Sequence, residues 1–252
     1  MTEPVLIEAR QVRKSYRRRV LDGEETILVL DGVDLAVRAR ESLAVCGDSG
    51  TGKSTLLNVL GGLDRPDSGQ VFHRGAELPL GIQDRARWRR REVGFIFQFH
   101  GLLPELTALE NVALAGLVAG WSSSKALSAA ATILEPLGLG TRATHFPSEL
   151  SGGEQQRVSI GRALLGSPSA VFADEPTGNL DPRTGTRVLD LLFDLQRQLG
   201  FALIVATHSS RLARRCDRIV RLAQGRLADS FPDDLEPPAA TDAAGPNMTV
   251  NP

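Results

Sequence analysis

The segment CGDSGTGKST, from Cys46 to Thr55, most constrains what this chain can fold into, because it directly follows the apolar run Leu43 to Val45. Its glycines allow backbone dihedrals that a Cβ forbids, so successive amide N–H groups can converge on one anion. A helix beginning near Lys53 would point its free N–H groups and the positive end of its dipole at the same anion. The sequence therefore predicts a strand, an anion-binding loop and a helix, in that order.

The same segment has the spacing of a nucleotide-binding P-loop. In the pattern G-x-x-x-x-G-K-[ST], the lysine reaches the outer phosphates and the hydroxyl, here that of Ser54, ligates a magnesium ion. A glycine-rich turn without a ligand would leave the lysine and the hydroxyl unexplained. We predict that the phosphates contact Gly47, Asp48, Ser49, Gly50, Thr51, Gly52, Lys53, Ser54 and Thr55. The motif alone does not separate kinases, GTPases, DNA machines and transport motors.

Composition limits the partners that we expect. The 252 residues carry 29 basic and 30 acidic side chains, so no global positive field indicates nucleic-acid binding. The two cysteines, Cys46 and Cys216, and the lack of an apolar N-terminal signal predict a reduced, cytosolic protein. The most apolar window, Asn111 to Trp121, is shorter than the roughly 20 residues that span a bilayer. We therefore expect membrane contact only through a partner.

The apolar runs predict an α/β fold. SLAVC, AVFADE and ALIVATH are short and almost wholly apolar, which is typical of parallel strands covered by helices on both faces. The segments Val5 to Tyr16 and Ile27 to Val37 alternate in part and indicate an antiparallel β edge layer. We expect the second of these to be broken by a turn at Asp31 and Gly32.

The rest of the chain predicts one domain with an insertion. From about residue 99 to residue 165 the sequence reads as helix punctuated by Gly, Pro and Ser, after a strand-like segment from Val93 to Gln98. We predict a domain over residues 5–227 with this α-helical subdomain inserted. Residues 228–252 are rich in Pro, Ala and Asp and have little to bury, so we expect a disordered tail.

A second motif, AVFADEPTGNLD, ends an apolar strand with two carboxylates. Asp174 and Glu175 would lie at the carboxyl edge of the sheet, where the P-loop also lies. We predict that Asp174 holds a magnesium ion, usually through water, and that Glu175 polarises the water that attacks the γ-phosphate. A structural role as a cap for the next turn fits one of these carboxylates but not both. The pair argues against a GTPase or a small-molecule kinase, neither of which would need a fixed water-activating glutamate here, and we expect hydrolysis.

A third motif, LSGGEQQR, predicts a helix start. Ser151 stands at the N-cap and Glu154 at the third helical position, which is the spacing of a capping box. With Gly152 and Gly153 the segment also has the ingredients of a second anion site without a lysine. One nucleotide does not need two such sites on one chain. A head-to-tail C₂ dimer gives both anion sites a role, because this segment then contacts the ATP that is bound by the partner subunit.

These motifs, in this order, resemble the ATP-binding subunit of an ABC transporter over about Val5 to Leu227. The resemblance implies a P-loop NTPase (RecA-like) core. It also implies that Tyr16 stacks on adenine and that Gln98 links the magnesium to the transport domain. Asp181 would contact the other subunit, and His208 would sense the γ-phosphate. Taken singly, Tyr16 also fits ordinary edge-strand surface and His208 a satisfied residue at a strand end.

The resemblance further implies the cofactors and the partners. The cofactors are ATP and Mg²⁺, and the implied metal ligands are Ser54, Gln98 and Asp174. The implied partners are an integral membrane permease subunit and, on ATP binding, a second copy of the chain. This places the protein at the cytoplasmic face of the inner membrane, as a peripheral subunit.

The segment GFIFQFHGLLPELTALENV indicates the branch of the family. It resembles lipoprotein-releasing ATPases and their neighbours, the macrolide exporters and the cell-division ATPase, and the run FHGLLPELT favours lipoprotein release. The alternative is an ATPase that regulates a cell-envelope enzyme through a membrane partner without moving cargo. DNA-repair and chromosome-structure ATPases are excluded, because no long coiled-coil arm separates Ser54 from Ser151. Phe99, Leu102 and Leu103 are candidates for a groove that receives a helix of the membrane subunit.

Several residues depart from the family pattern or allow two interpretations. Arg40 stands where glycine usually turns the chain, Gly161 replaces a customary alanine, and Ser209 follows His208 where aspartate is common. We expect Gly161 to weaken its helix by up to about 1 kcal/mol relative to alanine. The arginine-rich run RARWRRRE, from Arg85 to Glu92, could contact DNA or acidic lipid, but we favour a solvated helix face.

Overall fold

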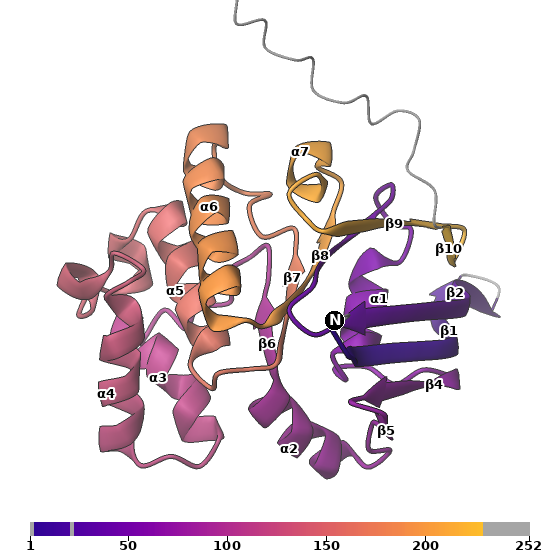
Figure 1. Ribbon diagram of the computed structural model, residues 1–252, viewed down its shortest axis with the longest axis horizontal. Helices are drawn as coiled ribbons and strands as arrows, with labels where there is room; N and C mark the ends of the chain where they lie inside the picture. Colours follow the sequence, from indigo (N-terminus) through magenta and orange to yellow (C-terminus); the bar gives the residue numbers. More distant parts are fainter. Residues whose placement is uncertain (1–2, 21–22, 229–252) are drawn as a thin grey trace, which may run out of the picture.

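The computed structural model describes residues 3–20 and 23–228 (Figure 1). The predicted tail at 228–252 lies outside this part of the chain, apart from Ala228. The strands are β1 (Val5–Val20), β2 (Gly23–Arg38), β3 (Ser42–Cys46), β4 (Ser68–His73), β5 (Ala76–Glu77), β6 (Val93–Ile96), β7 (Ala170–Asp174), β8 (Ala202–Thr207), β9 (Arg218–Ala223) and β10 (Arg226–Ala228). The helices are α1 (Lys53–Leu60), α2 (Ile82–Glu92), α3 (Ala108–Val118), α4 (Ser123–Leu134), α5 (Gly152–Leu164), α6 (Pro182–Leu199) and α7 (Ser210–Ala213), with 3₁₀ turns η1 (Gly140–Arg142) and η2 (Pro147–Glu149).

A central sheet with strand order β10-β9-β3-β8-β7-β6 confirms the α/β prediction. All of its pairings are parallel except that of β10 with β9. Every residue of β3 and β8 is buried, as expected for strands with both faces covered. In β7 the side chains alternate between two cores: Phe172 packs in the core that includes α1, and Val171 in the core that includes α5 and α6. This alternation fixes which carboxyl-edge side chains share a face with the P-loop.

The predicted antiparallel layer is a second sheet of order β2-β1-β4-β5, on the right in Figure 1. The predicted turn at Asp31 and Gly32 is wrong, because β2 continues through both residues. Gly32 has φ +72°, and the pairing register of β1 with β2 shifts close to this point, as in a β-bulge. The backbone N–H of Asp31 donates to the Gly225 carbonyl at 2.8 Å, which ties the bulge to the turn between β9 and β10.

Helices α3, α4 and α5 lie together on the left of Figure 1, and α3 packs on both of the others. A capping box at Thr107 and Glu110 starts α3, and the Ser122 hydroxyl caps α4. The side-chain amide of Asn111, which is fully buried, holds the preceding loop by bonding Leu103 and Leu106 backbone groups. These elements lie where helix was expected, and treating residues 99–165 as one inserted subdomain remains our prediction.

At Gly161, close packing of α5 on its neighbours matters more than helix propensity. An added Cβ would lie 2.8 Å from Leu137 Cδ1 and 3.3 Å from Val112 Cγ2, and both of these side chains are buried. Glycine therefore allows α5 to pack closely on its neighbours. We expect the gain of about 1 kcal/mol in helix propensity from Gly161→Ala to be outweighed by an overpacking cost of about 1–3 kcal/mol.

Thermal or urea unfolding of Gly161→Ala should therefore show a free energy of unfolding lowered by about 1 kcal/mol. Leu137→Val in the same chain removes volume beside the new methyl group, so the double variant should lose less than the sum of the two single variants. A more stable Gly161→Ala protein would show that propensity dominates after all.

Candidate nucleotide-binding site

The loop after β3 has the predicted form and packs on the carboxyl-terminal strands. Gly47 has φ +152°, and a Cβ there would lie 2.4 Å from the Leu222 carbonyl oxygen of β9. No side chain larger than hydrogen fits between the loop and β9. Gly52, with φ +100°, is the N-cap of α1, which has no side-chain cap and no acidic residue in its first turn. The first N–H groups of α1 therefore remain available to an anion.

Lys53 lies over this loop. Its side-chain ammonium donates to the carbonyls of Gly47 and Asp48, both at 2.8 Å, and the residue is only 8% exposed. The Thr51 hydroxyl donates to the same Asp48 carbonyl at 2.9 Å. These bonds hold the loop closed around the lysine, with its positive charge beside the start of α1.

A cavity of about 720 Å³ brings most of the predicted site residues together. It is lined by Tyr16, Val29, Asp48, Ser49, Gly50, Gly52, Lys53, Ser54, Thr55, Gln98, Asp174, Glu175 and His208. Gly47 and Thr51 belong to the same loop but do not line the cavity. Val29, on β2, was not predicted, and nothing in its sequence surroundings distinguishes it from the other apolar residues of that strand. The volume lies within the range of about 300–1,000 Å³ typical of small-molecule sites.

Glu175 is the most tightly held acidic group of this cavity. One carboxylate oxygen accepts the Thr207 hydroxyl at 3.0 Å, and the other accepts the His208 backbone N–H at 2.8 Å and lies 2.6 Å from His208 Nδ1. The backbone of Glu175 has φ +43°, a conformation that costs about 1–3 kcal/mol and persists only where its surroundings impose it. A carboxylate has about four acceptor positions, so one remains open for a water molecule.

Tyr16 reaches the cavity from β1 and is anchored outside it. Its hydroxyl donates to Asp64 at 2.8 Å, and Lys14 Nζ lies 3.0 Å from the same carboxylate and 5.1 Å from the tyrosine ring centre. Burial opposes ionisation of Asp64, but the hydrogen bonds from Lys14 and Tyr16 outweigh it and lower the pKa of this carboxyl group. Burial and the Asp64 bond raise the pKa of Tyr16. The ring is thus fixed in position beside the P-loop.

Gln98 is paired with a residue that the sequence did not single out. Its side-chain amide donates to Asn179 Oδ1 at 3.1 Å, and the Asn179 side chain donates back to the Gln98 carbonyl at 3.1 Å. Asn179 belongs to the second motif, in the loop after β7, so the pair ties the loop after β6 to the loop after β7. Asp174 and Gln98 both line the cavity with Ser54, and together they supply a carboxylate, an amide and a hydroxyl oxygen.

The third motif lies outside this cavity, at the start of α5. Ser151 and Glu154 form the predicted capping box: the Glu154 carboxylate accepts the Ser151 backbone N–H at 2.8 Å and its hydroxyl at 2.7 Å. These two bonds, opposed by slight burial, lower the pKa of Glu154. Gly152 and Gly153 follow in the first turn, and a Cβ at Gly153 would lie 2.4 Å from Thr184 Cγ2.

Asp181 is the N-cap of α6, where its carboxylate accepts the backbone N–H groups of Arg183 and Thr184, both at 3.1 Å. Within the described residues it performs this local role, and it does not line the nucleotide cavity. The first turns of α5 and α6 are in contact through Gly153 and Thr184. The third motif and Asp181 are therefore held together, away from the P-loop of the same chain.

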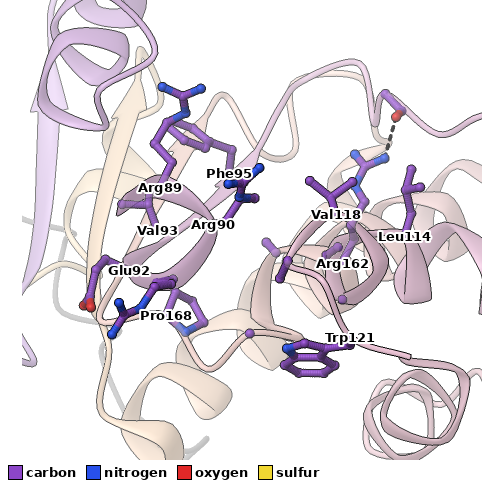
Figure 2. Close-up of a pocket in the computed structure, with 18 of the residues that line it drawn as sticks. Arg89, Arg90, Glu92, Val93, Phe95, Leu114, Val118, Trp121, Arg162 and Pro168 are labelled. Atoms are coloured by element: carbon purple, nitrogen blue, oxygen red, sulfur yellow. Dashed lines mark hydrogen bonds between the residues drawn. The ribbon is translucent and has the colours of Figure 1, made fainter. Parts of the chain in front are cut away.

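A second cavity, of about 710 Å³, lies between β6, α2, α3 and α5 (Figure 2). Phe97 and Gly101 of the loop after β6 line it, whereas Phe99, Leu102 and Leu103 do not. Phe99 and Leu103 are 75% and 43% exposed on the adjoining loop, and Leu102 packs partly on the core.

The expectation of a solvated face for the arginine-rich run is wrong in part. Arg85 is 9% exposed and donates to the carbonyls of Pro79 and Leu80, both at 3.0 Å. Arg89 donates to the Gly62 carbonyl at 2.6 Å. Backbone carbonyls outside the run accept hydrogen bonds from these two arginines, so the charge of the run alone did not predict their surroundings.

Neither a membrane-spanning helix nor a protein-only metal cluster occurs in residues 3–20 and 23–228. No helix there is long and apolar enough to cross a bilayer. In the same ranges, no group of three or more His, Cys, Asp or Glu side chains could hold a metal ion.

Comparison with known proteins agrees with this geometry. The sequence profile of the ABC transporter family matches residues 30–178. The lipoprotein-releasing system ATP-binding protein LolD of Shewanella oneidensis is 48% identical over 226 residues, which cover 89% of this chain and 96% of LolD. The uncharacterized ABC transporter ATP-binding protein YbbA of Escherichia coli K12 is 48% identical over 225 residues, covering 89% of this chain and 97% of YbbA.

Among solved structures, the chain is similar to the ATP-binding cassette MJ0796, in a dimeric structure of a post-hydrolysis state bound to ADP and Pi. The TM-score is 0.79 at 36% identity, and the match covers 90% of this chain and 100% of the cassette. The fold, the P-loop cavity and these similarities agree. The chain belongs to the ABC transporter family, as an ATP-binding subunit that hydrolyses ATP.

Proposed function

We propose that this subunit drives lipoprotein release or a closely related mechanical export, by dimerising on ATP and acting on a membrane permease. The observation that carries the proposal is the single cavity that joins the P-loop, Gln98, Asp174, Glu175 and His208. The branch rests on the segment from Gly94 to Val112 and on the similarity to LolD, whose name describes a lipoprotein-releasing system.

In this proposal the two parts of the site come from two subunits. Ser151, Gly152, Gly153 and Glu154 lie outside the nucleotide cavity of their own chain, so a second copy would bring them to the γ-phosphate, with Asp181 at the contact. Glu175 is the general base and His208 orients it and senses the phosphate, because the two side chains are hydrogen-bonded. Tyr16 stacks on adenine beside the P-loop.

The residues also fit Mg²⁺. Hard oxygen donors suit this ion, and Ser54, Gln98 and Asp174 supply three different ones to the cavity that contains Lys53. Too few carboxylates are present for a protein-only site, which agrees with an ion that arrives with the nucleotide phosphates. When bound, the ion neutralises phosphate charge, while Lys53 and the first N–H groups of α1 position the phosphates.

A permease partner would hold the subunit at the cytoplasmic face of the inner membrane. The exposed apolar side chains Phe99 and Leu103 adjoin the second cavity, where a helix of the partner can bury them. We expect Leu103→Asp to weaken binding to membranes of the source organism by about tenfold or more, because burying a charge costs more than exposing a leucine.

The control for this docking experiment is Leu199→Asp. Leu199 is 60% exposed at the end of α6, away from both cavities, so the same substitution should leave sedimentation with the membranes unchanged. Equal membrane binding by Leu103→Asp and wild-type protein, at equal thermal stability, would place the docking surface elsewhere.

The cargo is tested in cells. Expression of Glu175→Gln in the source organism should retain lipidated proteins in the inner-membrane fraction, measured by quantitative mass spectrometry of separated membranes. Wild-type protein at the same level is the control. An unchanged lipoprotein distribution together with altered cell-wall hydrolysis would instead favour the regulatory ATPase described above.

A further inference from the structure

The hydroxyl group of Ser151 is engaged within its own chain. It donates to the Glu154 carboxylate at 2.7 Å, and the backbone N–H of Ser151 donates to the same oxygen at 2.8 Å. A hydroxyl group has one proton to donate, and the oxygens of an ionised phosphate group only accept. To bind the γ-phosphate of the ATP held by a partner subunit, Ser151 therefore has to turn its proton away from Glu154.

This turn would leave a negative charge close to the phosphate. The Glu154 carboxylate would keep the backbone N–H of Ser151 and lose the hydroxyl proton, while an anion arrives at the other side of Ser151. Like charges at short range repel, and more strongly where an interface excludes water. The Glu154 side chain is only 20% exposed, so little water can replace the lost donor. A positive group beside Glu154 would remove this penalty.

Arg142 supplies such a group. Its Nε atom lies 3.4 Å from Oε1 of Glu154, the oxygen that Ser151 does not use. Within residues 3–20 and 23–228, it is the one side chain that forms an ion pair with Glu154. The hydrogen bonds from Ser151 lower the pKa of Glu154 most; burial opposes them, and the charges of Arg142 and then Arg157 lower this pKa further.

Neighbouring groups hold Arg142 in place. Its Nη1 atom lies 3.1 Å from His145 Nε2, and because a guanidinium group only donates, His145 accepts this bond. The first two backbone N–H groups of α3 donate to the carbonyls of His145 and Ala143, at 2.8 and 2.9 Å. The turn that carries Arg142 is thus fixed to α3. Arg142 does not line the nucleotide cavity of its own chain.

We infer that Arg142 is a positioning residue of the second anion site, Ser151 to Glu154: it keeps Glu154 neutralised while the Ser151 hydroxyl turns to the γ-phosphate of the partner subunit's ATP. The inference rests on the proposed function, which supplies the ATP-bound dimer, and adds the residue that allows the serine to change its hydrogen-bond partner. Arg142 therefore acts on dimer formation, and the binding of nucleotide to the P-loop of its own subunit does not depend on it.

The first experiment measures dimer formation in a Glu175→Gln parent protein, which is expected to retain uncleaved ATP. Arg142→Met removes the charge and keeps an unbranched side chain. The ATP concentration that gives half of the dimer, followed by light scattering, should rise by about fivefold or more. Arg142→Lys keeps a positive charge and should restore most of this loss. The affinity for ADP, measured by calorimetry, should equal that of the parent, because ADP lacks the γ-phosphate.

Arg87→Met is the matched control. Arg87 forms an ion pair with Asp84 at 3.0 Å on α2, is exposed and lines neither of the two large cavities. Its substitution should change neither dimer formation nor ADP affinity. If Arg142→Met weakened ADP binding by the same factor as dimer formation, Arg142 would only support local structure, and the inference would be overturned.

The second experiment tests whether Arg142 acts through Glu154. Glu154→Gln removes the negative charge and keeps an oxygen for the capping box. Without that charge there is nothing to neutralise, so Arg142→Met should raise the required ATP concentration much less in the Glu154→Gln background than with Glu154 present. An equal rise in both backgrounds would show that Arg142 acts directly on the nucleotide or on the other subunit, which would contradict the inference.

Two further outcomes separate this inference from the proposed function. If the parent dimerises on ATP and Arg142→Met leaves the required ATP concentration unchanged, the inference is wrong and the proposed function stands. If the Glu175→Gln parent itself forms no dimer with ATP, the proposed function fails, and the inference fails with it.

Discussion

Glu175→Gln should bind ATP and fail to cleave it. Glutamine keeps the shape of the side chain but removes the base, and general-base catalysis contributes about 100- to 10,000-fold. The amide oxygen can still accept the His208 backbone N–H, and the amide NH₂ can donate to the Thr207 hydroxyl, so the loop after β7 should keep its position. Phosphate release under single-turnover conditions measures the loss directly.

The same variant should form a stable dimer with ATP. A nucleotide held between the P-loop of one subunit and Ser151 to Gly153 of the other stabilises the associated state by mass action, and hydrolysis normally ends that state. Light scattering should show a species of doubled mass with ATP and not with ADP. Adding Ser151→Arg should abolish it, because the arginine blocks the face that the partner's nucleotide would contact. A Glu175→Gln protein that remains monomeric at saturating ATP, or hydrolyses it at the wild-type rate, would refute this mechanism.

Lys53→Ala should weaken ATP binding by about 100-fold, since each charge-assisted hydrogen bond to phosphate stabilises by about 1.5–3 kcal/mol. Lys53 is the one lysine or arginine among the described residues that line the nucleotide cavity, so none of these neighbours replaces its charge. Isothermal titration calorimetry with ATP and with ADP measures the change.

Two comparisons separate phosphate binding from loop integrity in this variant. Lys125→Ala removes an exposed lysine on α4, outside the cavity, and should leave ATP affinity unchanged. Because Lys53 also bonds the carbonyls of Gly47 and Asp48, the unfolding temperature of Lys53→Ala is measured without nucleotide. Wild-type ATP affinity in Lys53→Ala would be incompatible with the P-loop assignment.

Local sequence patterns predicted most helices and strands of this fold. The features that they did not predict depend on contacts with residues elsewhere in the chain. The run AVFADE correctly predicted a buried strand that ends in carboxylates, because the apolar residues and the carboxylates are adjacent in sequence. The continuity of β2 was missed, since Asp31 and Gly32 have the composition of a turn. Asp31 is instead held by Arg226, which donates to it at 2.7 Å from the far end of the domain.

The same reasoning applies within the site. The resemblance to ABC transporter subunits predicted Gln98 and Tyr16 as site residues, but it did not predict their hydrogen-bond partners Asn179 and Asp64. Asparagine and aspartate in loops have many local uses, so no pattern distinguishes these two. Arg85 was likewise expected in solvent, because a run of arginines does not reveal which backbone carbonyls will surround one of them.

The close contact of Gly47 with the Leu222 carbonyl has a consequence for how the protein is made. Strand β3, which leads into the P-loop, lies between β8 and β9: Leu43 is opposite Ile204 on one side and Arg218 on the other. Both neighbours leave the ribosome long after β3 itself, and such non-local pairings form slowly. The nascent chain thus carries its phosphate loop without this neighbouring strand until β9 has been synthesised, and the loop cannot take its nucleotide-binding form before then.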